Sequence, residues 1–554
     1  MIYLLKSRKK PGNQKTKSNP SDLKETIRQL EEQLSQPLIH NLPYPTIGDL
    51  LKGRGDELDM LQKQLAKGEK TAITQAQAIH GLGGIGKTRL AVEFGWHQIK
   101  KSHASGVFFV LADSLTNLIS NLANLAKPTL LNLPKQNLKD QPALVDMVIR
   151  TLSRMKNCLV IFDNVDDGHA IDKLHEILPQ LAGCQVLITS RRSNWKGVKE
   201  LPIYKLAIDD AIAYLLEKTK DRSETTADKK LAGKLADKLD GLPIALEQAA
   251  AYINYRHIGF QAYLGKFEEA RKEVLQWHKD SLQDYPKPVL VAWKTTENQL
   301  GLREKSVLRL ASFLAPDSIP TKLFEEKPES INNATELYAK ENGENLEQDN
   351  TEQTDIRDVL AELSRWSMIN LTEKSFYVHR LVQDSVRLRI PDATIESWTK
   401  VTLAMVRGFV PSDPPPDDIR SWDVWNTISP HVLVITDHGN KIKIPEPTAW
   451  LMNSLALYFN AKTSFEVAET LYHKALAINE NTVGPDHPNT ASCLNNLAQL
   501  YQATNRLKEA EPLMQRALKI DEASLGKDHP KVATDLNNLA ALYQATNRLK
   551  EAEP

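Results

Sequence analysis

The stretch AIHGLGGIGKTRLAVEF, residues 78–94, decides the fold class of the N-terminal part of this 554-residue chain. Residues 81–88 match the pattern G-x-x-x-x-G-K-[ST] at every position. Glycines at these positions let backbone N–H groups turn inward around phosphate oxygens. Lys87 brings a positive charge to the β- and γ-phosphates, and the Thr88 hydroxyl can bind magnesium. An apolar strand precedes the loop and a helix follows it, which directs the phosphates to a helix N-terminus. The stretch therefore predicts a P-loop for ATP or ADP with Mg²⁺.

Short apolar runs alternate with helical periods on both sides of this loop, from about residue 46 to 205. The apolar runs occupy residues 78–80, 106–112, 158–163 and 185–190, and the segments between them carry apolar residues at three- and four-residue intervals. Strands that alternate with amphipathic helices are typical of a parallel sheet covered on both faces. We therefore predict an α/β nucleotide-binding domain over residues 46–205.

The apolar run at 159–163, LVIFD, ends in a carboxylate. Downstream of a P-loop in the same sheet, this arrangement indicates a strand whose Asp163 holds magnesium directly or through water. Asn164 follows where many hydrolytic P-loop enzymes carry a second acid, and an amide cannot accept the proton of an attacking water. Asp166 or Asp167 is left as a candidate base, so we expect at most a slow ATPase.

The composition excludes several classes of function. Lys and Arg together number 70, as do Asp and Glu, so the zero formal net charge gives no global attraction to nucleic acid or a membrane surface. The three cysteines, Cys158, Cys184 and Cys493, form no CxxC pair, which favours reduced thiols over a disulfide framework or a zinc site. The sequence contains no run of about 18 apolar residues and no secretory signal pattern, so we expect a cytoplasmic protein.

Two segments stand apart by their charge. Residues 1–20 carry six basic and no acidic side chains, and residues 341–355 carry six acidic and no basic ones. We interpret both as solvated, mobile segments. The first belongs to a basic, partly disordered N-terminal segment, residues 1–45, in which residues 21–36 predict a short helix.

The strand signal fades after residue 206. Helical patterns follow one another over residues 206–287, which predicts a helical domain. Residues 288–390 combine helical segments with an acidic insertion near 325–356 and a strand-like ending at 376–379. The Pro-rich stretch 411–417 predicts a stiff connection within a helical linker, residues 391–450.

The C-terminal part, residues 451–554, repeats itself. LNNLAQLYQATNRLKEAEP begins at Leu494, and LNNLAALYQATNRLKEAEP begins 42 residues later at Leu536. Each unit contains two amphipathic helices that cannot bury their apolar faces alone, so neighbouring units must stack into an α-solenoid. The packing positions of tetratricopeptide repeats fall on apolar or aromatic residues in this unit, namely Leu497, Ala498, Tyr501, Ala510 and Ala517. The period resembles the 42-residue tetratricopeptide units of kinesin light chains.

The repeats also predict a partner. Asn495, Asn496, Asn537 and Asn538 fall where tetratricopeptide helices face the concave groove, and their amides can bond an extended peptide backbone. We therefore expect a protein or peptide ligand on the repeat groove. The last copy stops at Pro554, just as its second helix begins, and we expect Leu536, Leu539 and Tyr543 to lack a covering partner in a truncated array.

The order of the elements before the repeats resembles the NB-ARC proteins of the STAND class, the nucleotide switches of apoptosome scaffolds, plant resistance proteins and bacterial relatives. The resemblance covers about residues 46–390 and rests on LLKGRG (50–55), the P-loop, LVIFDN (159–164), ITSR (188–191), GLPIAL (241–246) and VHR (378–380). It implies that residues 288–390 form a winged-helix-like domain. It departs at the last element, where the family has Met-His-Asp and this chain has Val378, His379 and Arg380.

The resemblance assigns roles to single residues. Lys87, Asp163 and Arg191 would act on the phosphates, with Arg191 reading the γ-phosphate, and Thr88 with Asp163 would hold Mg²⁺. Pro243 would pack near the adenine in the ADP state, and His379 would contact the ADP β-phosphate. The implied nucleotide-binding set comprises Gly53, Arg54, Gly81, Gly83, Gly84, Ile85, Gly86, Lys87, Thr88, Arg89, Arg191, Pro243 and His379.

Three hypotheses of function follow. In the first, ADP holds the domains closed, exchange for ATP opens them toward a homo-oligomer, and the repeats sense the trigger of a signalling or defence response. In the second, the chain is a repeat scaffold with a permanently bound structural ADP, a hypothesis that Asn164 and Arg380 favour. The third is a DNA-binding regulator, which the neutral charge and the lack of a terminal helix-turn-helix pattern disfavour.

Overall fold

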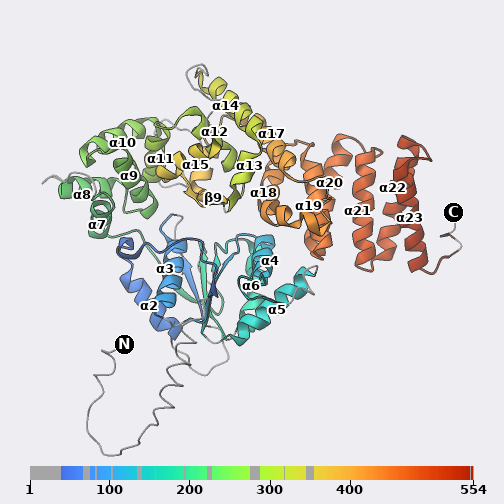
Figure 1. Cartoon of the computed structure of the whole chain (residues 1–554), viewed down its shortest axis with the longest axis horizontal. Coiled ribbons are helices and arrows are strands. Elements are labelled where there is room, and N and C mark those ends of the chain that lie inside the picture. The colour runs from blue at the N-terminus through green and yellow to red at the C-terminus, as the bar shows by residue number, and fades with distance from the viewer. Residues whose placement is uncertain are drawn as a thin grey trace, which may run out of the picture.

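The computed structural model describes residues 39–66, 75–80, 84–101, 104–133, 140–155, 157–181, 183–192, 195–220, 228–274, 287–316, 318–344, 355–549 and 551–552. An N-terminal α/β region lies below a helical region and a small-sheet region, and the helices of the repeat region extend to one side (Figure 1). The predicted helix at 21–36 lies outside the described residues.

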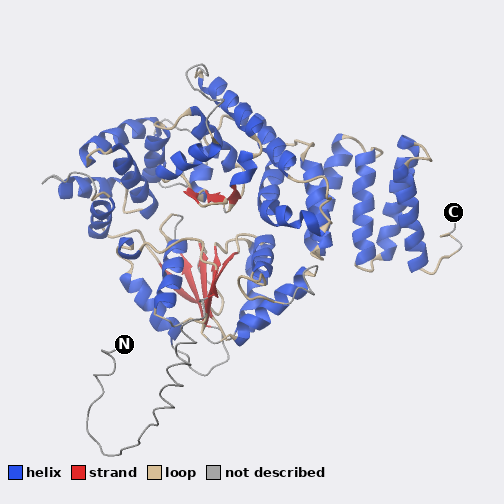
Figure 2. Cartoon of the chain, viewed as in Figure 1, coloured by secondary structure: helices blue, strands red, loops and turns tan. Residues whose placement is uncertain are grey.

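The α/β region is built on a six-stranded parallel sheet with the order β1-β3-β4-β5-β2-β6 (Figure 2). Its strands are β1 (Ile39–His40), β2 (Gln75–His80), β3 (Gly106–Leu111), β4 (Cys158–Asp163), β5 (Gln185–Ser190) and β6 (Lys199–Pro202). The four strands predicted from apolar runs are confirmed. The two edge strands β1 and β6 carry no continuous apolar run, and the sequence analysis missed them.

Helices cover both faces of this sheet. They are α2 (Gly55–Ala66), α3 (Lys87–Lys100), α4 (Leu115–Asn124), α5 (Gln141–Arg154) and α6 (Gly168–Ile177), with short 3₁₀ turns η1 (Gly48–Leu50) and η3 (Leu178–Leu181). Alternate strand residues point to opposite faces. Ile161 packs with the α3 side chain Phe94, whereas Val160 and Phe162 pack into a second core under α4, α5 and α6. Cys158 and Cys184, beside each other in that second core, are free and buried.

The helical region contains α7 (Ile208–Lys218), α8 (Asp228–Lys238), α9 (Pro243–Arg256) and α10 (Phe260–Val274). The small-sheet region contains α11 (Lys287–Glu297), α12 (Leu302–Ser312), β7 (Ile319–Pro320), α13 (Thr321–Glu325), α14 (Pro328–Asn342), α15 (Ile356–Arg365), β8 (Asn370–Leu371), β9 (Ser375–Tyr377) and α16 (Arg380–Arg387). Its three strands are antiparallel in the order β7-β9-β8.

The interpretation of residues 341–355 as a solvated segment is wrong at its first residue. Glu341 lies near the end of α14, where its carboxylate pairs with Arg309 at 2.7 Å and accepts hydrogen bonds from Thr394 and Trp398. A buried carboxylate with a cation and two donors is a structural element of this region. The acidic composition of the segment concealed that one acid, and residues 345–354 are outside the described part of the chain.

The repeat region follows two connecting helices, α17 (Asp392–Phe409) and α18 (Trp422–Lys441). Its antiparallel helices are α19 (Thr448–Ala461), α20 (Phe465–Thr482), α21 (Pro488–Ala503), α22 (Leu507–Leu525) and α23 (Pro530–Ala545), stacked side by side in Figure 1. The predicted packing residues are confirmed, since Leu497, Ala498, Tyr501, Ala510 and Ala517 are all buried. No helix among the described residues is both long and apolar enough to cross a membrane.

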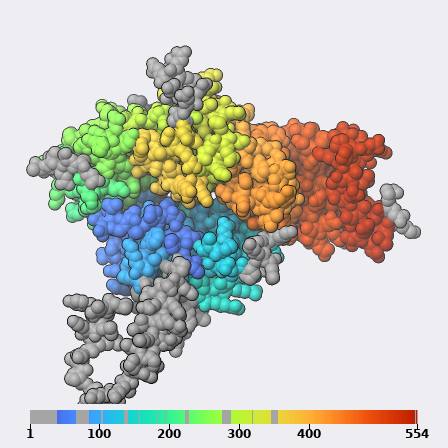
Figure 3. Space-filling model, in the orientation of Figure 1, coloured from blue at the N-terminus to red at the C-terminus, as the bar shows by residue number. Residues whose placement is uncertain are grey.

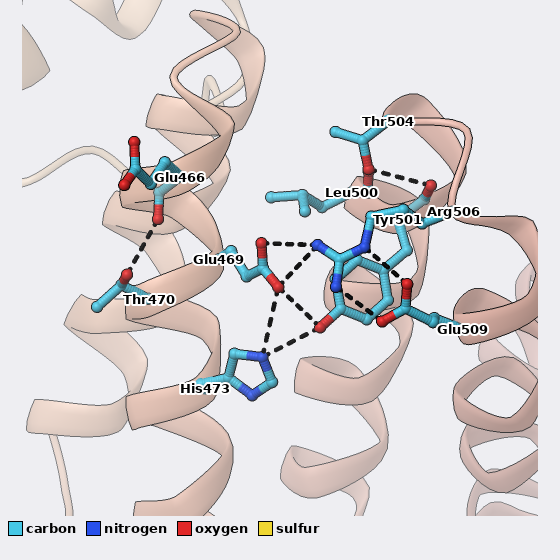
Figure 4. A network of polar contacts seen from close by, with 9 residues as sticks. All are labelled: Glu466, Glu469, Thr470, His473, Leu500, Tyr501, Thr504, Arg506 and Glu509. Atoms are coloured by element: carbon cyan, nitrogen blue, oxygen red, sulfur yellow. Dashed lines mark hydrogen bonds and ion pairs between the residues drawn. The ribbon is translucent and has the colours of Figure 1, made fainter.

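The repeats are joined by a polar clamp that recurs with the 42-residue period (Figure 4). Arg506 lies over the Tyr501 ring at 4.0 Å and pairs with Glu469 of the preceding repeat at 2.8 Å and Glu509 of its own at 2.7 Å. The Tyr501 hydroxyl donates to Glu469 and lies 3.1 Å from His473. In the next unit, Arg548 lies over Tyr543 and pairs with Glu511 and Glu551.

The groove asparagines bond to one another across neighbouring repeats. Asn496 donates to Asn453 at 3.1 Å, and Asn538 donates to Asn495 at the same distance, 42 residues further along. Asn537 is exposed. Part of the hydrogen-bonding capacity of these amides is thus already used between helices, which the sequence analysis did not anticipate.

The expectation that the last helix lacks cover is wrong for two of its three apolar side chains. Leu539 and Tyr543 are buried where α23 packs on α22, and Gln515 of α22 donates to the Tyr543 hydroxyl. Leu536 is 47% exposed, as expected. One preceding helix pair is therefore enough to bury most of the apolar face of α23.

The turn between α19 and α20 contacts the α/β region directly. The Lys462 carbonyl accepts a hydrogen bond from the Gln141 backbone N–H, Ser464 donates to the Gln141 side chain, and Thr463 donates to Asp140. Asp140 is also the N-cap of α5, so the first repeat meets the start of that helix. In the space-filling view the orange part of the chain borders the cyan part of the α/β region, and the red repeats extend away from it (Figure 3).

Candidate functional site

The described half of the P-loop has the backbone that the motif requires. Gly84 and Gly86 have φ values of +79° and +93°, which side chains other than glycine rarely adopt, and α3 begins directly after them at Lys87. No side chain caps this helix N-terminus. Amide groups at an uncapped helix start suit an anion. Gly81 and Gly83 lie outside the described residues.

Thr88 and Asp163 lie next to each other at the carboxyl end of β4. The Thr88 hydroxyl donates to Asp163 Oδ1 at 2.8 Å, and Thr189 at the end of β5 donates to the same oxygen. Burial raises the pKa of the Asp163 carboxyl to about 6, against the effect of these two hydroxyls and of Lys87. The Thr88 hydroxyl and the Asp163 carboxylate supply two oxygen ligands of the kind that Mg²⁺ prefers. They lie near Lys87, where a phosphate would bind. The residues therefore fit the ion.

Lys87 and Arg191 form the cationic part of the site. Burial lowers the pKa of Lys87 to about 8, the charge of Arg191 adds to this effect, and the charges of Asp166 and Asp163 oppose it. Arg191 follows β5, and its side chain is about half exposed. Asp166 accepts a hydrogen bond from the Arg191 backbone N–H at 2.7 Å and pairs with its Nε at 3.3 Å. Two cations brought together in this way favour a polyphosphate.

Three regions of the chain meet at Gly84. A Cβ atom placed on Gly84 would lie 2.9 Å from the Ile244 side chain of α9 and 3.1 Å from that of Leu381 in α16. Pro243, the predicted neighbour of the adenine, is the first residue of α9. The structure thus brings the P-loop, the GLPIAL segment and the VHR segment together, although the last two lie more than 150 residues from the first.

His379 precedes α16 and caps it. Its Nδ1 accepts a hydrogen bond from the Leu381 backbone N–H at 3.2 Å, so in the neutral ring Nε2 carries the proton and can donate to an anionic oxygen. Burial lowers the pKa of His379 to about 4, with further lowering by the charges of Lys87 and Arg191. The residue is nevertheless exposed to solvent overall, so the pKa is lowered by the protein atoms packed around the ring and not by complete exclusion from solvent.

Other residues of the predicted nucleotide-binding set contact the P-loop or the segments beside it. The buried Arg54 donates to the Ile85 carbonyl of the P-loop and to the Tyr204 carbonyl after β6, and pairs with Glu57. Gly53 has a φ of +61°, and a Cβ there would collide with the Asp210 carboxylate. Arg89 turns toward the N-terminal segment, where it donates to the Pro45 carbonyl and lies over Tyr44.

One acid near the site, Asp113, was not predicted from the sequence, and the structure gives contacts for Arg380 and Asp167. Asp113 follows β3, where burial raises its pKa while Asn117 and the charge of Arg380 lower it. Arg380, which stands where the family pattern has Asp, thus acts on an acid of the α/β region. Asp167 accepts from the Ala170 N–H and is the N-cap of α6. A sequence lists acids near a strand end but cannot tell which of them cap a helix and which face the loop.

Comparisons with known proteins find matches in three parts of the chain. Residues 54–236 match the NB-ARC domain, residues 296–395 match a domain of unknown function (DUF7779), and residues 447–523 and 506–554 match tetratricopeptide repeats. A nucleotide-binding leucine-rich repeat (NLR)-like protein of Hyaloscypha variabilis is 24% identical over 499 residues, or 79% of this chain and 44% of the relative. The chain therefore spans less than half the length of that relative.

Two solved structures are among those to which parts of the chain are similar. A STAND protein with a tetratricopeptide repeat sensor from Pyrococcus horikoshii is 13% identical, covers 92% of this chain and 82% of its own, and has a TM-score of 0.40. A putative kinesin light chain from Podospora anserina, with nearly identical TPR-like repeats, is 21% identical over 28% of this chain and 71% of its own, with a TM-score of 0.24. This chain joins a nucleotide-binding NB-ARC domain to C-terminal tetratricopeptide repeats.

Proposed function

We propose that this protein is a molecular switch that binds ADP in a closed form and ATP in an open one, and that its repeats couple the change to a protein partner. The observation that carries the proposal is the meeting of Gly84 with Ile244 and Leu381, because three regions close over one P-loop. A nucleotide that binds this arrangement shifts the balance between closed and open forms only as far as its affinity for the two differs.

The described residues supply the chemistry that a magnesium nucleotide needs. Lys87 would contact the β- and γ-phosphates, and the start of α3 would add backbone N–H groups. Thr88 and Asp163, 2.8 Å apart, would hold Mg²⁺, which supplies charge neutralisation on the phosphates when bound. Arg191 would read the γ-phosphate, and the Nε2 proton of His379 would be donated to the β-phosphate from the small-sheet region.

We expect hydrolysis to be slow. Asn164 cannot accept a proton. Asp167 Oδ1 caps α6, and Asp166 accepts hydrogen bonds at Oδ1 from Ser190 and Arg191 while its Oδ2 pairs with Arg191 Nε, so we expect neither carboxylate to act as an effective base. The cycle would then depend on nucleotide exchange more than on turnover.

The repeats have a physical route to the nucleotide. Lys462, Thr463 and Ser464 bond to Asp140 and Gln141 at the start of α5, so a ligand that moves the first repeat would change a contact of the α/β region. We propose a protein or peptide as this ligand, held in the groove of α19, α21 and α23. The open form would be the one that associates with further copies, in a signalling or defence role.

Exchange of the bound nucleotide tests the proposal. The full-length protein is loaded with a fluorescent ADP analogue and chased with excess ATP and Mg²⁺, and release is timed. A switch releases ADP while remaining folded, and the double variant Thr463→Val with Ser464→Ala should release it several-fold faster by weakening the contact with α5. Thr470→Val, which changes one exposed residue of α20, serves as control.

The alternative is a scaffold with a permanent structural ADP. Asn164 and Arg380, which depart from the hydrolytic and Met-His-Asp patterns, favour it. In that case ADP leaves only when the protein unfolds, and the contact variants leave the release rate unchanged. That outcome would replace the switch with the scaffold.

A further inference from the structure

Asp166 is the acid of the site for which the sequence offers no settled role. It lies in the turn after β4, three residues beyond Asp163, and its side chain is largely buried. One of its oxygens, Oδ1, accepts from the Ser190 hydroxyl at 2.9 Å and from the Arg191 backbone N–H at 2.7 Å. The other, Oδ2, has no hydrogen-bond partner among the described residues and lies 3.3 Å from Arg191 Nε.

These contacts hold Arg191 at both ends. The backbone N–H is fixed by one oxygen and the Nε of the side chain by the other, while Ser190 anchors the carboxylate itself and also donates to the Val165 carbonyl. Binding at Nε leaves the two terminal nitrogens of the guanidinium for a second anion, the fork that suits phosphate oxygens. Holding the stem of a long side chain also reduces the rotamer entropy that it loses when a ligand binds.

The charge of Asp166 also matters for its neighbours. Arg191 and Lys87 are like charges that interact in the same site, and Asp166 interacts favourably with both. Without the negative charge of Asp166, the repulsion between Lys87 and Arg191 would be stronger. Arg191, which is about half exposed, could then turn toward solvent.

We propose that Asp166 is the positioning residue for Arg191 and thereby sets how strongly the protein distinguishes ATP from ADP. The inference rests on the proposed function, since it assumes that Arg191 contacts a γ-phosphate. Asp166 acts through Arg191 and does not touch the nucleotide. Loss of Asp166 therefore weakens the binding of ATP, which has a γ-phosphate, and leaves the binding of ADP nearly unchanged.

A double-mutant cycle on the full chain tests this inference. Dissociation constants for ATP and ADP, each with Mg²⁺, are measured for the wild type, Asp166→Asn, Arg191→Ala and the double variant. Asp166→Asn keeps the shape and an acceptor for Ser190 but removes the charge. Arg191→Ala should weaken the binding of ATP about tenfold relative to that of ADP. Asp166→Asn should weaken ATP binding about threefold to tenfold, and the double variant should match Arg191→Ala. Asp172→Asn, an exposed acid of α6, should change neither nucleotide.

The outcomes separate this inference from the function beneath it. If the wild type binds neither nucleotide, or Arg191→Ala leaves the ATP-to-ADP ratio unchanged, the proposed function fails. If Arg191→Ala changes the ratio and Asp166→Asn does not, or if Asp166→Asn changes it equally with and without Arg191, the inference alone is overturned. A loss of ATP and ADP binding in equal measure by Asp166→Asn also overturns it, because that is the effect of a merely structural acid.

A second variant keeps the test valid if Asp166→Asn does not fold. Ser190→Ala removes one anchor of the carboxylate without changing any charge, and the Ser190 side chain is completely buried in a position where alanine fits. It should lower the preference for ATP in the same direction by about twofold. An unchanged preference in a folded Ser190→Ala protein would count against the positioning role.

Discussion

The site around Lys87 is formed by side chains from distant parts of the chain. In the repeat region, by contrast, equivalent contacts recur every 42 residues. Arg191 and His379 lie outside the repeats, so the 42-residue period supplies no equivalent of either. Arg506 and Arg548 hold equivalent places over Tyr501 and Tyr543. The comparison teaches that contacts in the first region depend on single side chains, whereas the repeats distribute their stability over similar units. The predictions below test whether this difference holds.

The largest effect is expected at the P-loop. ADP with Mg²⁺ at about 100 times its dissociation constant should stabilise the full chain by roughly 2.7 kcal/mol, and Lys87→Ala should abolish this gain because the phosphates lose their principal cation. Thermal unfolding with and without ADP measures both effects. Lys63→Ala, which changes an exposed lysine of α2, is the matched control and should keep the full shift. An unchanged midpoint of the wild type at millimolar ADP would remove the basis of the proposed function.

The next effect is a change of preference between nucleotides. His379→Ala removes the proposed Nε2 donor to the β-phosphate, from a ring whose pKa is affected by the charges of Lys87 and Arg191, so ADP should bind about ten- to a hundred-fold more weakly, and ATP much less so. Calorimetric titration of the full chain with each nucleotide gives the two constants. His473→Ala changes a histidine of the repeats and should affect neither. Equal weakening of ADP and ATP by His379→Ala would contradict the assigned role.

The two regions also differ in how far the sequence predicted them. The P-loop, the strand ending at Asp163 and the 42-residue period are local patterns, and the structure contains the strands and helices that they predict. The role of Asp166 was not predictable, because it depends on Ser190 and Arg191, which arrive from another strand. The family resemblance alone implied that the VHR segment meets the P-loop, and it did not predict the contact of Gly84 with Leu381, since no pattern in either segment refers to the other. Pairings between remote segments depend on packing, which periodicity does not encode.

A third, smaller effect should appear in the clamp between repeats. Tyr501→Phe removes a hydroxyl that bonds to Glu469 and His473 and should destabilise the adjoining repeats by about 1 kcal/mol. Tyr543→Phe is the same change one period later, where the hydroxyl accepts from Gln515 alone among the described residues. It should cost less. Hydrogen exchange of α21–α23 in the full chain measures both, and equal losses would mean that position in the array does not matter.

The last effect concerns a place where two equivalent repeat junctions differ. Asn479 and Cys493 are in contact between α20 and α21, and 42 residues later Asp521 and Asp535 take their places between α22 and α23. Both carboxylates are buried, and Asn495 donates to Asp535 at 2.8 Å. Burial raises the pKa of Asp535 to about 6, and the charge of Asp521 adds to this effect while Lys531 opposes it.

Because the pKa of Asp535 is higher in the folded repeats than in the unfolded chain, the folded form holds a proton between about pH 4 and pH 6 that the unfolded form has lost. The packing of α23 should therefore be firmest below pH 4 and weaken as the pH rises through about 6, by about 1 kcal/mol after solvent screening. Hydrogen exchange of α23 at pH 5 and pH 7.5, corrected for intrinsic rates, measures the change.

Asp535→Asn should remove this pH dependence and stabilise the helix at neutral pH. Asp528→Asn changes an exposed acid in the preceding turn and should leave the pH dependence intact. The junction at Cys493 should show no such dependence in the same experiment. If it does, the difference between the two junctions does not come from the acid pair.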